Sequence, residues 1–260
     1  MARRLRILGC GSSGGVPRLG GHWGDCDPSN PRNSRSRCSI LLTEEAEGRS
    51  TRVLIDTSPD MRAQLLAAEV GTLDAVVYTH PHADHVHGID DLRMVVFNTR
   101  RRMPIWADGQ TSDMLLTRFG YVFSTPEGSN YPPIADLNLI EGPFTAAGLP
   151  FEPLRLQHGE MTALGFRVGS FAYLPDVSAI PEAAMARLKG LDLLLIDALR
   201  REPHPSHAHL AQTLEWIARL RPARAVLTNM HVDLDYDTLC AELPEGVTPA
   251  YDGMELDLAP

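Results

Sequence analysis

The segment His80-Pro81-His82-Ala83-Asp84-His85 contains three of the ten histidines of the chain. In an extended segment, residues two apart project to the same side, so His80 and His82 can bind one cation together. If the chain then turns into a helix, Asp84 and His85 can point toward a second cation. Imidazole and carboxylate ligands without a neighbouring cysteine are typical of an open catalytic site for Zn, Mn or Fe. The competing interpretation is a run of surface or helix-capping histidines.

The segments around this motif alternate between strand and helix patterns. Strand-like composition marks residues 4–8, 39–43, 52–56 and 73–79. Ser58 is expected to cap a helix that has Pro59 at its first position, and residues 88–96 look helical. The histidine motif therefore lies in a loop between a strand and a helix, a common position for catalytic residues.

The second half of the chain repeats this alternation. Its expected elements are, in order, a hairpin of residues 165–168 and 171–174, a helix at 181–189, a strand at 191–197, a helix capped by Ser206 and a strand at 225–228. Two halves of similar order predict an α/β fold, a four-layer αβ/βα sandwich of two sheets packed face to face with helices outside. We expect a single domain over residues 1–260.

Composition narrows the class of substrate. The 260-residue chain has a formal net charge of -9, which would repel a long nucleic acid, so a small substrate is expected. The four cysteines lie far apart with no CxxC pair, which is typical of a reducing cytoplasm. No stretch has the apolar length that a membrane span needs, so no membrane partner is expected.

Three polar residues farther along the chain could complete a metal centre. His158, Asp176 and His231 each follow or end an apolar, strand-like run. Loops at such positions would face one common edge of the sandwich. Taken singly, a His or Asp there is more often an ordinary polar loop residue. Taken with the histidine motif, the three favour a shared site.

The complete series of these residues resembles the metallo-β-lactamase superfamily. The resemblance implies a hydrolase with two divalent metal ions, Zn or Mn, as cofactors. It implies a role for each residue: His80, His82 and His158 bind one ion, Asp84, His85 and His231 bind the other, Asp176 bridges them, and Asp84 also takes part in catalysis. Asp56 resembles a group that supports the ligand loop without binding metal.

A closer resemblance is to the PhnP-type phosphodiesterases. It rests on Gly9-x-Gly11, Gly15-Val16-Pro17, Arg37-Cys38-Ser39, Ser206-His207-Ala208-His209-Leu210, Leu227-Thr228 and Asp252-Gly253-Met254-Glu255. It implies cleavage of a small cyclic, nucleotide or sugar phosphodiester by hydroxide from a water between two metals. His207 matches the general acid that protonates the leaving group, at the start of the helix expected there. Relatives of this type often form dimers, so a homodimer is also considered.

The chain departs from the PhnP pattern in two places. The early loop of that family has paired cysteines for an additional structural zinc, whereas this loop has only Cys26, with His22 before it. The last metal ligand of the family directly follows a threonine. Here the order is Thr228-Asn229-Met230-His231, so His231 would have to act from two residues farther along.

Substrate contacts are expected from two further segments. Ser12 and Ser13 lie in a glycine-rich loop whose backbone N–H groups could bind a phosphate, although a tight turn explains the loop equally well. His209 is expected to contact substrate and is the second candidate for the general acid.

Two other functions are compatible with the same fold. A tRNA-processing nuclease of the ribonuclease Z kind would need an exosite arm or a basic platform, and the sequence suggests neither. The other alternative is a non-hydrolytic metal protein, such as an iron oxygenase or a PqqB-like carrier.

Overall fold

Two seven-stranded sheets form the centre of the molecule. The computed structural model describes residues 2–259. The first sheet contains, in spatial order, β14 (Glu255–Leu258), β1 (Ala2–Gly9), β2 (Ser39–Ala46), β3 (Arg49–Ile55), β4 (Ala75–Val77), β5 (Met103–Ala107) and β6 (Ala135–Leu139). The second contains β13 (Val247–Pro249), β12 (Arg224–Thr228), β11 (Leu193–Asp197), β10 (Phe171–Leu174), β9 (Met161–Val168), β8 (Leu149–His158) and β7 (Phe144–Ala146).

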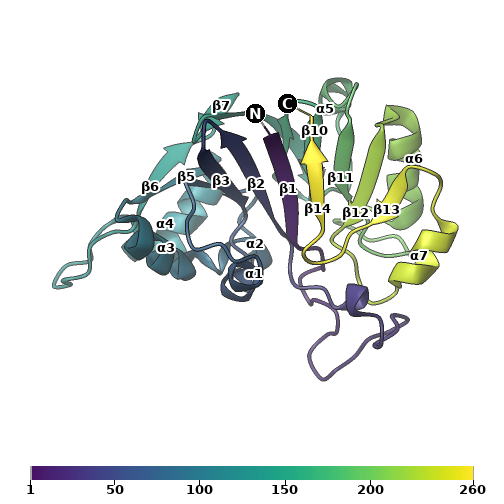
Figure 1. Cartoon of the computed structure of the whole chain (residues 1–260), viewed down its shortest axis with the longest axis horizontal. Helices are drawn as coiled ribbons and strands as arrows, with labels where there is room; N and C mark the ends of the chain where they lie inside the picture. Colours follow the sequence, from purple (N-terminus) through teal and green to yellow (C-terminus); the bar gives the residue numbers. More distant parts are fainter. Residues whose placement is uncertain (1, 260) are drawn as a thin grey trace.

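Helices lie on the outer side of each sheet (Figure 1). Those beside the first sheet are α1 (Met61–Ala67), α2 (Ala83–Val86), the 3-10 helix η2 (Ile89–Asp91), α3 (Leu92–Thr99) and α4 (Gly109–Phe123). Those on the side of the second sheet are α5 (Glu182–Arg187), α6 (Leu210–Leu220) and α7 (Tyr236–Glu242), and a 3-10 helix, η1 (Pro31–Asn33), lies in the long loop after β1. The predicted four-layer αβ/βα sandwich is confirmed.

Alternating side chains in the strands build the two cores. In β2, Ile40 and Leu42 belong to the core between the sheets, whereas Leu41 belongs to the core under the helices. Leu54 of β3 likewise faces the helices. Because successive strand residues point to opposite faces, one apolar run serves both layers. The sheet is thus covered on both sides, as its continuous apolar strands require.

The helix expected to have Ser58 as its N-cap begins two residues later. Asp60 is the N-cap of α1, so the prediction that Ser58 caps the helix with Pro59 at its first position is wrong. Ser58 Oγ accepts from the N–H of Asp60 at 3.1 Å and donates to Gln64 Oε1 at 2.9 Å. The hydroxyl therefore stabilises a turn before the helix.

The segment around His207 also differs from the expected helix start. His209 is the N-cap of α6, and Ser206 does not cap it. Arg200 pairs with His209 in an isolated bridge, and the N–H of Leu210 donates to the carbonyl of Arg200 at 2.8 Å. Pairing with residues after β11 delays the helix. His207 consequently lies before the helix, two residues ahead of its N-cap.

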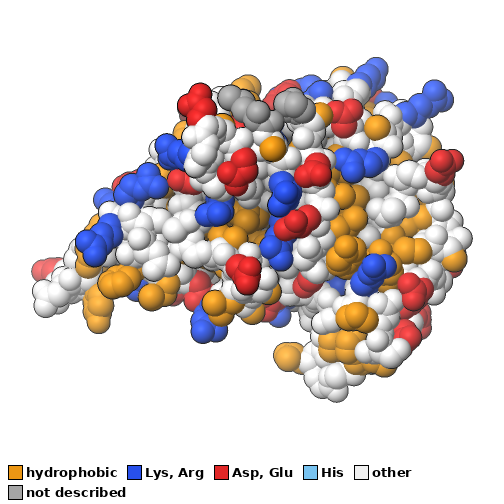
Figure 2. All heavy atoms as spheres, viewed as in Figure 1, with side chains coloured by type: hydrophobic (Ala, Val, Ile, Leu, Met, Phe, Trp, Pro, Cys, Tyr) orange, Lys and Arg blue, Asp and Glu red, His pale blue; other side chains and the backbone are white. Residues whose placement is uncertain are grey.

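Among residues 2–259, no helix is both long enough and apolar enough to cross a membrane. On the face drawn in Figure 2, acidic and basic side chains are interspersed and no continuous basic surface is visible.

Asp252 connects the C-terminal segment to both ends of the loop between β1 and β2. Its carboxylate accepts from the N–H of Cys10 at 3.1 Å, and from the N–H and hydroxyl of Ser36 at 2.7 and 2.6 Å. Burial raises the pKa of this carboxyl from 3.8 to about 6, although the bonds from Ser36 and Cys10 oppose the rise. The loop of residues 10–38 is anchored at both of its ends by this one side chain.

The raised pKa of Asp252 makes a testable prediction about stability. Between 3.8 and about 6 the folded chain binds more protons at this carboxyl than the unfolded chain does, so raising the pH through that window destabilises the fold. Relative to the non-titrating variant Asp252→Asn, the wild type should lose up to about 3 kcal/mol of unfolding free energy over this window. Urea unfolding at several pH values measures the difference. If the unfolding free energy of the wild type minus that of Asp252→Asn stayed constant or increased with pH, the raised pKa of Asp252 would be contradicted.

Candidate metal centre

The histidine motif begins just beyond β4: His80 and His82 lie in the loop that leads into α2, and Asp84 and His85 lie in the first turn of that helix. His80 and His85 are fully buried, whereas His82 is exposed. His87, the fourth histidine of this stretch, is exposed and packs its ring against Phe119 instead. The centre is therefore open to solvent on the side of His82.

Asp56, at the end of β3, holds this loop in place. Its carboxylate accepts from the N–H of Thr79 at 2.8 Å, from the Thr79 hydroxyl at 2.7 Å and from His85 Nδ1 at 2.7 Å. Because the Thr79 hydroxyl donates its one hydrogen bond to Asp56, its oxygen accepts from His80 Nδ1 at 3.0 Å. Both imidazoles thus carry a proton on Nδ1 and direct Nε2 toward the centre as the atom that could bind a cation. This is the supporting role that was predicted for Asp56.

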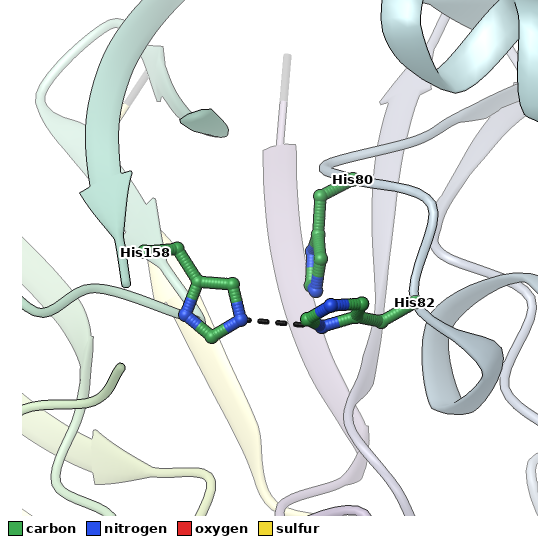
Figure 3. A group of neighbouring side chains, drawn as sticks. All are labelled: His80, His82 and His158. Atoms are coloured by element: carbon green, nitrogen blue, oxygen red, sulfur yellow. Dashed lines mark hydrogen bonds between the residues drawn. The ribbon is translucent and has the colours of Figure 1, made fainter. Parts of the chain in front are cut away.

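Three histidines from two sheets form the first ligand group (Figure 3). The ligand nitrogens of His80, His82 and His158 lie within 4.8 Å of one another. His158 ends β8 and is held by its Nδ1, which donates to the carbonyl of Ser206 at 2.6 Å. Its Nε2 faces His82 Nδ1 at 3.2 Å. The free nitrogens therefore converge on one point.

Carboxylates and His85 form a second group beside the first. His85 Nε2 lies 3.1 Å from Asp176 Oδ2 and 3.6 Å from Asp84 Oδ2. Because His85 Nδ1 already donates to Asp56, Nε2 presents a lone pair to these negatively charged oxygens unless a proton or a cation lies between them. His80 Nε2, His85 Nε2 and Asp176 Oδ2 are buried and make no hydrogen bond. Such unpartnered nitrogen and oxygen atoms fit a divalent metal ion.

The charges of the group shift its pKa values strongly. Burial would lower the pKa of His85, but the carboxylates of Asp176, Asp56 and Asp84 outweigh burial and hold that pKa well above the usual value. Burial lowers the pKa of His80 well below its usual value, so this imidazole is neutral. Asp176 is the reverse case, because His85 and His80 overcome burial and keep its pKa well below normal. A cavity with this much negative charge favours a cation.

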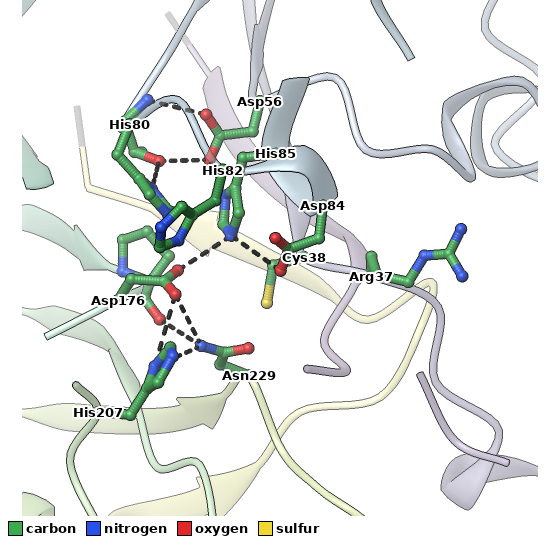
Figure 4. Close-up of polar contacts among 12 residues, drawn as sticks. Arg37, Cys38, Asp56, His80, His82, Asp84, His85, Asp176, His207 and Asn229 are labelled. Carbon is green, nitrogen blue, oxygen red and sulfur yellow. Dashed lines mark hydrogen bonds and ion pairs between the residues drawn. The ribbon is translucent and has the colours of Figure 1, made fainter. Parts of the chain in front are cut away.

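His207 lies at the edge of the centre and is paired with a buried carboxylate. Its Nδ1 is 2.9 Å from Asp197 Oδ2. The same atom is 3.5 Å from Asp176 Oδ1 (Figure 4). Burial would lower the pKa of His207, but Asp197 raises it to about 9. Burial raises the pKa of Asp197 to about 7, against the attraction of His207. The proton of the pair therefore resides on the imidazole at neutral pH.

Most of the predicted metal ligands are brought together. His80, His82, Asp84, His85, His158 and Asp176 surround one point where the two sheets meet, and His207 joins them. His231 does not: its Nδ1 lies 3.3 Å from Asp233 Oδ1 and its Nε2 contacts Arg18. The structure therefore does not bring His231 together with the other predicted ligands. Asn229 has a positive φ of 61°, and the N–H of Met230 donates to the carbonyl of Cys10, so the chain turns away before His231 is reached.

The three predicted substrate residues lie in different settings. The N–H of Ser12 donates to the carbonyl of Met230, and its carbonyl accepts from Gly15, so this segment is the tight turn and the Ser12 N–H is not free for a phosphate. Ser13 is exposed and lines an open cavity of about 590 Å³ together with Arg18 and Arg37. His209 caps α6, and its Nδ1 is buried without a hydrogen-bond partner.

Sequence reasoning missed three residues of the centre. Asp197 is the last residue of the strand predicted at 191–197, a position like that of Asp176, and this signal could have found it. Asn229 occupies the position directly after the threonine, where the family has its ligand, and its side chain contacts Asp176. Thr79 carries no signal in the sequence, because its role depends on a carboxylate 23 residues away.

Comparison with known proteins identifies the family. A model of the Beta-lactamase superfamily domain matches residues 51–230. The solved structure of a diphosphatase from the PhnP family is 36% identical, with a TM-score of 0.89, and the alignment covers 99% of this chain and 98% of that one. Human tRNase Z, short form, has a TM-score of 0.68 at 17% identity over 97% of this chain and 98% of that one, which shows a shared fold.

Curated relatives carry other names. An octanoyltransferase of Porphyromonas gingivalis is 37% identical over 259 residues, which are 97% of this chain and 51% of that protein. The chain thus spans about half the length of this relative. Coenzyme PQQ synthesis protein B of Pseudomonas aeruginosa is 26% identical over 98% of this chain and 99% of that protein. The chain belongs to the metallo-β-lactamase superfamily, close to its PhnP family.

Proposed function

We propose that the protein is a metal-dependent phosphodiesterase acting on a small cyclic, nucleotide or sugar phosphodiester. The observation that carries the proposal is the pairing of two features at one point. Buried, unpartnered ligand atoms of His80, His85 and Asp176 gather there, and a protonated imidazole, His207, lies beside them. The first feature suits activation of water by a cation, and the second suits protonation of a leaving alkoxide.

The ligand set suits Zn or Mn, because it combines imidazole nitrogens with carboxylate oxygens and has two groups of ligand atoms. Divalent cations there would make hydroxide available near neutral pH and neutralise charge on the phosphoryl oxygens. The residues of the chain bind and orient. Asp176 lies between the two groups, and the partly exposed Asp84 can accept a hydrogen bond from the attacking water.

His207 serves as the general acid in this proposal. Asp197 holds the imidazole by Nδ1, so its other nitrogen is free to donate a proton. A pKa of about 9 keeps that proton in place at neutral pH. As the P–O bond breaks, negative charge develops on the leaving oxygen, and transfer of the proton from His207 neutralises it. His209 caps a helix behind this position and is assigned to substrate contact.

A second candidate substrate class follows from the PhnP-family relative, which is described as a diphosphatase. Cleavage of a phosphoanhydride would use the same water activation, but its phosphate leaving group needs less protonation than an alkoxide. A panel that contains alkyl phosphodiesters, dinucleoside diphosphates and phosphomonoesters separates the two classes. Turnover of the diphosphates alone would replace the phosphodiester proposal.

Two histidine variants should separate metal binding from proton transfer. His82→Ala removes a ligand atom, so we expect loss of bound metal and of activity. His207→Ala should keep its metal and lose about 10²- to 10⁴-fold in kcat, the usual contribution of a general acid. Metal content by mass spectrometry and turnover are measured on the same preparations. His87→Ala, an exposed histidine of the same segment, is the matched control. Equal metal loss in the two test variants would overturn the role of His207.

The leaving group should decide how much His207 matters. A p-nitrophenolate leaves without a proton, whereas an alkoxide needs one. We expect His207→Ala to slow alkyl phosphodiesters far more than bis(p-nitrophenyl) phosphate, measured as the ratio of kcat/KM to the wild type. A similar loss on both substrates would mean that His207 acts on metal or structure instead.

Removal of metal should destabilise the fold. Without a cation, His85 has to carry a second proton on Nε2 to face the oxygens of Asp84 and Asp176, and the folded chain loses the stabilisation that metal binding gives it. A cation at about 100 times its Kd adds about 2.7 kcal/mol, which corresponds to roughly 5 °C in Tm for a chain of this size. Chelator treatment followed by addition of Zn²⁺ or Mn²⁺ in a thermal melt measures the effect. An unchanged Tm on chelation and readdition, with metal content verified, would be evidence against the centre.

A further inference from the structure

Asn229 occupies the place on β12 from which a last ligand would reach the centre. It directly follows Thr228, the final residue of this strand, and is fully buried. β12 pairs with β11 in parallel, with Thr228 opposite Asp197, so the side chain of Asn229 reaches both Asp176 and His207. His231 is turned outward to Asp233 and Arg18. The residue that this strand offers to the centre is an amide.

The orientation of this amide is determined by its neighbours. Asn229 Nδ2 donates to the carbonyl of Pro175 at 3.0 Å and to Asp176 Oδ1 at 3.3 Å. Nδ2 also lies 3.3 Å from His207 Nδ1, which donates to Asp197. Because the two oxygens of Pro175 and Asp176 are both acceptors, the NH₂ group faces them and the amide oxygen points away (Figure 4). An NH₂ group does not bind cations. Asn229 therefore supports Asp176 by a hydrogen bond and offers no ligand atom in this arrangement.

The two ligand groups are consequently unequal. The first has three imidazole nitrogens, from His80, His82 and His158, within reach of one another. The second has His85 with a share of Asp176, and Asp84 lies 3.6 Å from His85. His80 also lies within reach of His85 and Asp176, but its one ligand nitrogen already belongs to the first group. The strand end that could close the second group presents an NH₂ group. Zinc sites in proteins normally have at least three protein ligands, and loss of a supporting contact alone typically costs 10- to 100-fold in affinity.

We infer that the centre binds one divalent cation tightly at the group of His80, His82 and His158, and a second one weakly and exchangeably at Asp84 and His85, because Asn229 is not a ligand. The inference rests on the proposed metal centre and deepens it. It concerns affinity and stoichiometry, so it does not depend on which substrate is cleaved.

Zinc stoichiometry and affinity test this inference without any substrate. The protein is loaded with Zn²⁺, freed of loosely bound metal by gel filtration, and analysed by mass spectrometry; a chromophoric chelator then reports the affinity of each binding step. The wild type should retain about one Zn²⁺ per chain, with a second step at least about tenfold weaker. Retention of two equally tight Zn²⁺ ions by the wild type would overturn the inference.

Asn229→His should convert the weak site to a tight one. Histidine is among the residues that tolerate a positive φ, so the backbone at this position can accept it. The variant should retain about two Zn²⁺ per chain. Asn229→Asp has nearly the shape of asparagine and adds an anionic oxygen, so it should also tighten the second step, and it carries the test if the larger imidazole does not fit. Circular dichroism verifies folding. No tightening in either folded variant would overturn the inference.

His231→Ala is the matched control, because His231 lies only two residues farther along the chain. It should leave both the number of retained ions and the two affinities unchanged. A fall in retained zinc in this variant would make His231 a ligand and reject the assignment to Asn229. If the stoichiometry is as expected but no phosphodiester or diphosphate is cleaved, the proposed function fails while the inference about the two sites stands.

Discussion

The buried carboxylate of Asp56 is the interaction on which the centre depends. It has no contact with solvent, and burial raises its pKa, yet three donors from Thr79 and His85 compensate the cost of burying it. Asp56 binds Nδ1 of His85 directly and Nδ1 of His80 through Thr79, so the Nε2 atoms of both rings point into the centre. Asp56 also has a positive φ of 65°, which turns the chain sharply at the end of β3.

The packing of the two sheets supplies the other half of the centre. Residues at the ends of β8, β10, β11 and β12 face the loop that follows β4, and three of these strands run parallel and side by side. Their ends therefore meet at one edge, which places Asp176, Asp197 and Asn229 next to one another. Side chains anchored on paired strands move little, so ligand atoms that are far apart in the chain are held at fixed positions relative to one another.

Exposure divides the centre into a supporting side and a reacting side. Asp56, His80, His85, Asp176 and Asp197 are buried and act on their neighbours through hydrogen bonds and charge. His82 is exposed, and Asp84 and His207 are partly exposed, so these three side chains lie where a substrate can reach them. The proposed chemistry of water activation and proton donation takes place on this accessible side. The buried side determines which protonation states the accessible side can adopt.

The sequence alone was enough to predict the fold from local patterns, and those patterns together with the family resemblance singled out most of the residues that the structure brings together at the centre. Apolar runs of strand length predicted the sandwich. The spacing of His80, His82, Asp84 and His85 predicted that these four side chains of one short segment point toward the same site. Only the tertiary structure decided which residue after β12 reaches the centre and which carboxylate holds His207. Those outcomes depend on the left-handed turn at Asn229 and on the pairing of β11 with β12, which bring together residues that have no local relation in the chain.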